Sequence, residues 1–423
     1  MEPIKLFKEK LGGELSKKIF SSPYTYQLAK FLFVSKSPYE FKGLNELTSL
    51  GLDLTAQAYK EKQPTIFTTA FFPEELVYAF DGTPFAPEVA AATATSLELS
   101  PELLKEAEKS GFSRDVCSFH RVAAAGVPQD YFPQPDLFLA SSHLCDGAPQ
   151  LFRYLSQHYN KPYFILDVPA NNDEAALKYV TEQLELLVAF MEKVFEKPLD
   201  HEKLNKIIEY SNQARENQLI FNETRKSYPG VLSGEQAIAL VYLHFLCEGL
   251  AKTPEIYAAL TKEIKEKYYQ NTDTSYWQSN KPKILWSHLR PFFPNEIFNI
   301  LEKELHVDIV FEEMNHVYWP PLEPDKPLES IAQKVLSHPL VGPIKKRTNT
   351  LLDLIDTFQA DGLIHFSHWG CRQAIGGVPY LNKFLKRHGV AFLNLDTDCV
   401  DQNNYFSGQI RTRLESFVEM ITH

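Results

Sequence analysis

The chain has 423 residues, with 43 Lys and Arg against 54 Asp and Glu and a formal net charge of −11. This length allows two or three domains with substantial cores, and the acidity, without a basic cluster, argues against a nucleic-acid-binding surface. No apolar run reaches the roughly 18 residues that span a bilayer, and the first residues lack the apolar core of a signal peptide. We therefore expect a cytoplasmic protein whose five cysteines are free or metal-bound rather than paired.

The expected elements divide the chain into a helical N-terminal layer (1–62), a first α/β lobe (63–200), a helical connector (201–280) and a second α/β lobe (281–423). The first lobe should contain, in order, a strand over 64–69, helices beginning at Pro73, Ser100 and Cys117, a strand over 136–141, a helix over 148–160 and a strand over 162–168. The last three of these form a parallel β-α-β unit with a right-handed crossover.

Between the lobes, residues 172–281 are expected to be almost entirely helical. Apolar residues recur there at intervals of three and four, as in 174–195, 201–224 and 234–250. Cys247 lies inside the last of these helices, among apolar neighbours, and is expected to fill a helical core.

The second lobe repeats the alternation of strands and helices. We expect strands over 281–288 and 307–311 around a helix over 294–305, and then a Pro-rich surface excursion over 315–343 that is partly helical after Ser330. The rest of the lobe should contain a helix over 344–360, a strand leading to Cys371, a helix over 376–388, a strand over 390–396 and a helix over 408–421. The predicted fold is therefore α/β, with two parallel-sheet lobes of the Rossmann or flavodoxin kind. Ligands bind such sheets at the carboxyl ends of the strands.

Two cysteines end segments of the same design. The apolar runs 136–145 and 361–371 each finish in a cysteine, and each is followed by a helix, a short apolar strand and an aspartate, Asp167 or Asp396. The interval from cysteine to aspartate is 22 residues in one copy and 25 in the other. We interpret this as a repeated β-Cys-α-β unit that places a thiol at a strand end in each lobe.

Cys117, Cys145 and Cys371 all lie at a predicted strand end or helix start. The chain has no C-x-x-C pair, which argues against a zinc ribbon or a thioredoxin-like motif. Three thiolates meeting from two lobes could hold a [4Fe–4S] cluster with one iron open to a substrate oxygen. Spacing alone, however, favours ordinary buried thiols, and the cluster is the alternative.

Seven short segments carry a family resemblance, in this order: 72–84, Cys117-Ser-Phe-His-Arg121, Cys145-Asp-Gly147, 162–169, His368-Trp-Gly-Cys-Arg-Gln373, 395–401 and 408–419. Together they resemble the D-component family of 2-hydroxyacyl-CoA dehydratases and benzoyl-CoA reductases. The resemblance runs from about residue 64 to the end, and residues 1–60 and 200–280 contribute little to it.

The resemblance implies a [4Fe–4S] cluster on Cys117, Cys145 and Cys371 and an anaerobic hydro-lyase activity. Family members add one electron to a 2-hydroxyacyl-CoA thioester, and the resulting ketyl radical expels the neighbouring hydroxyl group. A separate ATP-hydrolysing iron–sulfur activator supplies that electron, and this chain has no G-x-x-x-x-G-K-[ST] motif of its own. The resemblance also implies a homologous second subunit or a self-dimer.

The polar neighbours of these cysteines are further candidates. His120 and His368 each lie three residues from a proposed ligand and could donate to a substrate carbonyl or a sulfur, with a structural role as the alternative. Arg121 and Arg372 could bind a CoA phosphate or an acidic acyl group. The alternative for the two arginines is ion pairing with nearby acids, Asp115 or Asp146.

The remaining polar candidates are expected to be structural. Four aspartates that follow strands should cap the next element rather than catalyse; they are Asp167, Asp396, Asp398 and Asp401. Cys399 has no assigned role and is expected to be a free thiol.

Three other functions compete with dehydration. A reductase of the same superfamily would leave its electrons in the product and consume ATP stoichiometrically. A non-catalytic subunit would only relay electrons, and a two-lobed sensor would contain no iron. A double-cubane protein is disfavoured because it needs about six thiolates, whereas this chain has five cysteines.

Overall fold

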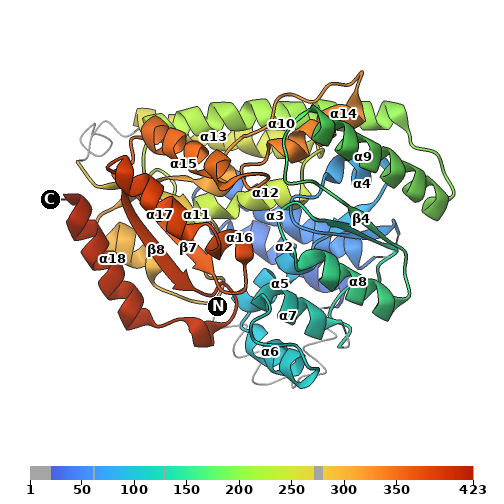
Figure 1. Cartoon of the computed structure of the whole chain (residues 1–423), viewed down its shortest axis with the longest axis horizontal. Helices are drawn as coiled ribbons and strands as arrows, with labels where there is room; N and C mark the ends of the chain where they lie inside the picture. Colours follow the sequence, from blue (N-terminus) through green and yellow to red (C-terminus); the bar gives the residue numbers. More distant parts are fainter. Residues whose placement is uncertain (1–20, 61, 128, 271–279, 423) are drawn as a thin grey trace.

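The computed structural model describes residues 21–422 except 61, 128 and 271–279, and contains two four-stranded parallel sheets (Figure 1). The first sheet has the order β2-β1-β3-β4, with strands β1 (Thr65–Thr68), β2 (Thr83–Phe85), β3 (Leu137–Ser141) and β4 (Tyr163–Leu166). The second has the order β6-β5-β7-β8, with strands β5 (Lys283–Ser287), β6 (Asp308–Glu312), β7 (Gly362–His368) and β8 (Ala391–Thr397). The predicted two-lobed α/β fold is confirmed.

Helices cover the sheet of the first lobe, as the alternating pattern requires. They are α4 (Glu74–Ala79), α5 (Pro87–Ser96), α6 (Ser100–Lys109), α7 (Ser118–Gly126) and α8 (Ala148–Tyr159). Sequence reasoning missed β2, which has only three residues and contains Pro84. Proline cannot donate to a sheet ladder and is tolerated at an edge, and β2 is indeed the edge strand beside β1.

The second lobe follows the same plan. Its helices are α14 (Pro327–Ser337), α15 (Ile344–Phe358), α16 (Arg372–Ile375), α17 (Val378–Arg387) and α18 (Ser407–Thr422). The predicted helix over 294–305 is a π-helix, η2, confined to Asn299–Glu304. The parallel register of β7 and β8 runs from Gly362 opposite Ala391 to His368 opposite Thr397.

Within the described residues, three long helices and two short ones connect the lobes. They are α9 (Glu174–Phe195), α10 (His201–Ser227), α11 (Gly234–Ala239), α12 (Val241–Leu246) and α13 (Lys252–Gln270). In Figure 1, α10 and α13 run side by side along the top of the view. The single helix predicted over 234–250 is two short helices, α11 and α12, and Cys247 caps the second and is fully buried in the helical core.

The N-terminal layer is helical where it is described. Helix α2 (Pro23–Lys36) packs on α3 (Lys42–Ala58), and the helical structure predicted for the first 20 residues lies outside the described residues. Helix α3 buries one face against the connector, with Leu44 and Leu47 in the same core as Leu260 of α13. None of the described helices is long and apolar enough to cross a membrane.

The Pro-rich segment 315–343 was predicted to be a surface excursion that is partly helical after Ser330. Residues 323–326 are exposed and α14 is helical, but other side chains of the segment are buried, which corrects the prediction in part. Trp319 is 4% exposed and Leu322 is 2% exposed, and Leu322 packs in the core of the first lobe. A side chain of α10 satisfies the backbone polar groups of this extended segment. The amide of Asn212 accepts a hydrogen bond from the N–H of Leu322 and donates one to its carbonyl. With its backbone paired in this way, a non-helical segment can be buried.

Candidate metal centre

A cavity of about 490 Å³ lies where the carboxyl ends of the two sheets meet, and all three predicted cysteines line it. Cys117 and Cys145 come from the first lobe and Cys371 from the second. Most of the other lining residues are apolar, and they include Phe71, Phe119 and Phe292. The structure thus brings together the three thiols that were predicted at strand ends and helix starts.

Each thiol lies at the beginning of a helix. Cys117 is the N-cap of α7, Cys371 is the N-cap of α16, and Cys145 precedes α8 by three residues. Burial raises the thiol pKa of Cys371, and the backbone N–H groups of Ala374 and Gln373, in the first turn of α16, oppose this rise by donating to its sulfur. Unpaired N–H groups at a helix start favour negative charge, so all three positions suit a thiolate.

Gly370 lets two of these helix starts approach each other. Its φ is +76°, and a Cβ at this position would lie 2.7 Å from both the nitrogen and the Cα of Cys117. A side chain there would therefore collide with backbone rather than with a movable side chain. The turn that delivers Cys371 touches the turn that delivers Cys117 only because residue 370 is glycine.

Three imidazoles pair with the three thiols. The Nε2 atom of His368 lies 3.3 Å from the sulfur of Cys117. The Nε2 atom of His120 lies 3.9 Å from the sulfur of Cys145. Each of these two histidines therefore contacts a thiol other than the one beside it in sequence.

The hydrogen-bond partners of His368 fix its tautomer. The backbone N–H of Cys399 donates to Nδ1 of His368 over 3.1 Å, so Nδ1 must be unprotonated and the proton must lie on Nε2. His368 therefore donates to the sulfur of Cys117. Burial lowers the pKa of His368, which keeps the ring neutral at pH 7.

Sequence reasoning missed the third imidazole, His288. It follows β5 directly, its Nε2 lies 4.0 Å from the sulfur of Cys371, and burial lowers its pKa well below the usual value. Its φ of +74° is uncommon for a residue other than glycine, and such strain is found at functional sites. This backbone feature cannot be read from sequence.

Burial raises the pKa of all three thiols, and neighbouring thiols raise those of Cys117 and Cys145 further. For Cys117 the largest cause is burial, followed by the charges of Cys145 and Cys371. Burial and Cys371 together raise the pKa of Cys145 to about 12. Three thiolates that line one cavity repel one another unless a cation lies among them, and thiolates are the ligands that iron–sulfur clusters take.

A cluster fits this donor set better than a single metal ion does. Within the described ranges, no group of three His, Cys, Asp or Glu side chains converges as one ion would require. Each iron of a [4Fe–4S] cluster takes its own thiolate, so the sulfurs around a cluster lie farther apart than the ligands of a single ion. The three cysteines would hold the cluster, and the fourth iron would have no cysteine from the cavity lining.

Glu88 is the carboxyl group of the cavity, and sequence reasoning missed it as well. It lies in the first turn of α5 and lines the cavity, and its Oε2 atom is buried without a hydrogen-bond partner among the described residues. Burial raises the pKa of Glu88 to about 7. A carboxyl group with this pKa exchanges protons readily near neutral pH.

The two arginines proposed to bind CoA both have partners in the protein. Arg121 is 1% exposed and bonds the carboxylates of Asp401, over 3.1 Å, and Glu108, over 3.3 Å. Arg372 is exposed and forms an ion pair with Asp146, across the turns that carry Cys371 and Cys145. Neither arginine lines the cavity, so the geometry favours the ion-pair alternative for both.

The aspartates that follow strands bind neighbouring protein groups. Asp398 accepts hydrogen bonds from the backbone N–H groups of Val400 and Asp401 and from the hydroxyl of Ser118, the first residue of α7. Cys399 is fully buried in the core of the second lobe and does not line the cavity. These residues hold the start of α7 against the end of β8.

The fold and the cavity define a two-lobed α/β protein with a thiol-lined site between its parallel sheets. The chain belongs to the 2-hydroxyglutaryl-CoA dehydratase D-component family, whose sequence model matches residues 69–421. The resemblance recognised in the sequence is thereby confirmed.

Curated relatives match between 62% and 89% of the chain at low identity. The (R)-phenyllactyl-CoA dehydratase alpha subunit of Clostridium sporogenes is 21% identical over 391 residues, covering 89% of this chain and 94% of that protein. A benzoyl-CoA reductase subunit of Thauera aromatica is 24% identical over 379 residues, covering 82% and 86%. The beta subunit of the same Clostridium sporogenes dehydratase is 23% identical over 274 residues, covering 62% and 69%. The chain is thus similar to subunits of both dehydratases and reductases.

Proposed function

We propose that this chain is an iron–sulfur subunit of a 2-hydroxyacyl-CoA dehydratase, a hydro-lyase acting on an acyl-CoA thioester. The single observation that carries the proposal is the cavity lined by Cys117, Cys145 and Cys371. These thiols would hold a [4Fe–4S] cluster. When bound, such a cluster would supply one low-potential electron to the thioester carbonyl, which allows the adjacent hydroxyl to leave.

The chain's own residues prepare the site for this chemistry. The helix starts and the Nε2–H of His368 donate to the sulfurs and stabilise their anionic form. Aromatic and aliphatic walls limit the access of water, which would otherwise quench a reactive intermediate. Glu88 is placed to accept the β-proton at Oε2, because the residue lines the cavity and this oxygen has no partner of its own among the described residues.

The proposal includes two protein partners. Alpha and beta subunits of one dehydratase both match this chain, which supports a complex with a homologous second subunit or, failing that, a self-dimer. The electron would come from a separate ATP-hydrolysing iron–sulfur activator, because the chain contains no phosphate-binding G-x-x-x-x-G-K-[ST] motif.

A reductase is the second candidate, because the benzoyl-CoA reductase subunit of Thauera aromatica matches about as well as the dehydratase subunits do. The two reactions differ in their electron balance. Dehydration returns the electron after each turnover and needs ATP and reductant only in catalytic amounts, whereas reduction consumes both stoichiometrically. Counting ATP hydrolysed per product formed separates the two.

Anaerobic purification followed by iron and sulfide analysis tests the proposal. We expect about four of each per chain in the wild-type protein, a marked loss in Cys371→Ser, and no loss in Cys247→Ser, whose thiol is buried in the helical core. Iron-free wild-type protein would contradict the proposal. Substrate-induced changes in the cluster's spectrum would further distinguish a substrate-binding site from an electron relay.

A further inference from the structure

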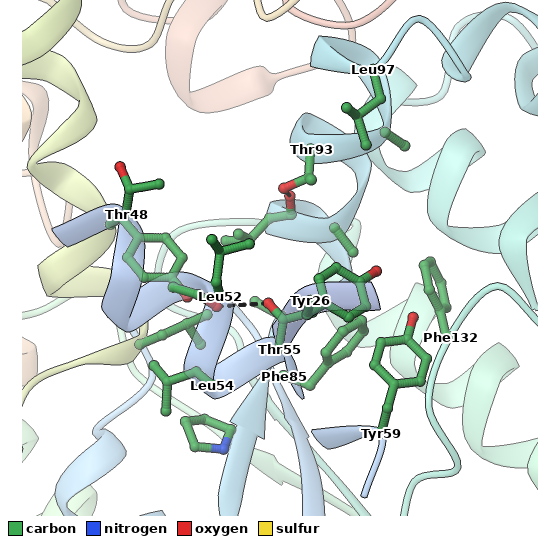
Figure 2. Close-up of a pocket in the computed structure, with 18 of the residues that line it drawn as sticks. Tyr26, Thr48, Leu52, Leu54, Thr55, Tyr59, Phe85, Thr93, Leu97 and Phe132 are labelled. Carbon is green, nitrogen blue, oxygen red and sulfur yellow. Dashed lines mark hydrogen bonds between the residues drawn. The ribbon is translucent and has the colours of Figure 1, made fainter. Parts of the chain in front are cut away.

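A second cavity, of about 330 Å³, adjoins the thiol-lined one. It lies between the N-terminal helices and the first lobe, and we call it the apolar chamber (Figure 2). Residues that define it include Tyr26, Leu52, Thr55, Phe85, Leu97 and Phe132. Figure 2 shows these side chains around a common space, with contributions from α2, α3, β2 and α5.

The two cavities share a wall. Five residues line both of them: Thr48, Val89, Thr93, Ala239 and Tyr242. Helix α5 lies at this boundary, because Glu88 lines only the thiol cavity, Ala90 lines only the apolar chamber, and Val89 between them lines both. A ligand that reaches the thiols therefore has the apolar chamber directly beside it.

The apolar chamber offers almost no free polar group. No Asp, Glu, Lys, Arg or His lines it among the described residues. The hydroxyls of Thr48, Thr55 and Thr93 donate to the carbonyl four residues earlier in their own helices, over 3.2, 2.8 and 3.0 Å. The Tyr59 hydroxyl donates to the carbonyl of Tyr131. With these four hydroxyls paired and no charged side chain among the described lining residues, the chamber presents mainly apolar and aromatic surface, to which Tyr26, Tyr131 and Tyr242 add phenol groups.

We propose that the apolar chamber receives the acyl group of the substrate, so that the enzyme acts on CoA thioesters of bulky apolar acids, aromatic or branched, and not on those of dicarboxylic acids. This inference rests on the proposed function, which places the thioester in the thiol-lined cavity. A carboxylate at the far end of the acyl group would be buried without a partner, at a large cost in binding free energy. The chamber's volume exceeds the roughly 150 Å³ that accommodates a benzene-sized group.

Gly51 provides a direct way to fill the chamber. It lines the chamber from α3, and the atoms nearest to a Cβ there would be the ring and hydroxyl of Tyr242, at 3.5 Å, an ordinary contact. Gly51→Ala and Gly51→Leu should therefore reduce the free space in two steps without disturbing the fold. Gln57→Leu, on the exposed face of the same helix, is the matched control.

The test is the binding of non-reacting thioesters to the full chain by calorimetry. We expect 3-phenylpropanoyl-CoA to bind at least about tenfold more tightly than glutaryl-CoA. Gly51→Leu should weaken 3-phenylpropanoyl-CoA about tenfold and Gly51→Ala less, while acetyl-CoA, too short to enter the chamber, stays within about twofold. Gln57→Leu should change none of the three.

Several results would overturn the inference: equal affinity for the phenylpropanoyl and glutaryl thioesters, equal effects of Gly51→Leu on all three ligands, or no binding of any of them. The failure of the proposed function would look different. A protein without iron or turnover that still prefers the aromatic thioester, and loses this preference in Gly51→Leu, retains the acyl site. An active dehydratase without this preference refutes the acyl site alone.

Discussion

At the residue scale, histidines in the thiol-lined cavity contact cysteines that are distant from them in sequence. His368 lies three residues before Cys371 but donates to Cys117, and His120 lies three residues after Cys117 but faces Cys145. Burial lowers the pKa of His120 to about 4. The imidazoles around the thiols are therefore neutral rather than cationic at physiological pH, and His368 is the one whose hydrogen bonds make it a donor to a thiol.

Glu88 carries the first prediction. Its pKa of about 7 means that the carboxylate, the form that accepts a proton, becomes populated as the pH rises through 7. We expect kcat for dehydration to rise with pH over this range in the wild type. Glu88→Gln should lower kcat by about 10²- to 10⁴-fold and remove this dependence, without changing the iron content.

The matched control is Glu102→Gln, which changes an exposed glutamate in the first turn of α6. It should leave both kcat and the pH profile unchanged. A Glu88→Gln enzyme that keeps the wild-type pH dependence would show that the proton passes through another group.

At the scale of elements, the ends of β3 and β7 and the starts of α7, α8 and α16 assemble the site. Parallel strands end at the same edge of their sheet, and a helix begins directly after or shortly after each cysteine. The two lobes are then joined through particular contacts, such as the hydrogen bond from Ser118 to Asp398 over 2.6 Å.

Gly370 gives the second prediction. Gly370→Ala should push the turn of Cys371 away from the backbone of Cys117 and lower the iron and sulfide content of anaerobically purified protein, because the added Cβ has no room. Gly389→Ala is a close control: Gly389 has a similar φ of +74°, but a Cβ there meets nothing within 4 Å. Both variants share the backbone strain, so equal iron loss in both would contradict the role of the close approach.

The ion pair between α10 and β6 gives the third prediction. Arg225 donates two hydrogen bonds of 2.8 Å to Glu312, and both side chains are buried. Arg225→Ala leaves a buried carboxylate without its cation, so the free energy of unfolding, measured with urea, should fall by about 3–5 kcal/mol. Lys226→Ala removes an exposed pair on the same helix and should cost less than about 1 kcal/mol. Equal losses would mean that the buried pair does not hold the connector to the second sheet.

At the scale of the whole molecule, the lobes interlock. The core of the first lobe contains Leu322, Ile331 and Val341, which follow the strands β5 and β6 of the second lobe in sequence. The core of the second lobe contains Leu103 and Phe119 from the first. The cavity is therefore held by cores that each draw on both halves of the chain.

The fourth prediction concerns acid stability. Glu313 is buried and bonds Arg347 through both carboxylate oxygens, and its pKa falls to about 2 from an ordinary value of 4.5. A lowered pKa stabilises the fold above pH 4.5, and this contribution of about 3 kcal/mol is lost as the pH falls toward 2. We expect the unfolding free energy of Glu313→Gln to depend less steeply on pH between 4.5 and 2 than that of the wild type. Glu323→Gln, at an exposed position, should keep the wild-type slope, and identical slopes in all three proteins would contradict the assignment.

The local sequence determined every strand except β2, most helices and the positions of Cys117, Cys145 and Cys371, because apolar periodicity and helix starts are properties of neighbouring residues. Local sequence patterns gave a wrong prediction where burial depends on a distant part of the chain. The Pro-rich segment was expected at the surface, yet Asn212 of a distant helix pairs the backbone of Leu322 and allows this residue to be buried. Domain boundaries and metal ligands remain predictions.

Only the tertiary structure decided which groups surround the thiols. His288, Glu88 and the apolar chamber come from segments far apart in sequence, and nothing in their local patterns marks them as neighbours. Their chemistry depends on burial, which raises the pKa of Glu88 and lowers that of His288. Burial is a property of the packed molecule, so the sequence alone pointed to the three thiols, whereas the fold supplied their surroundings.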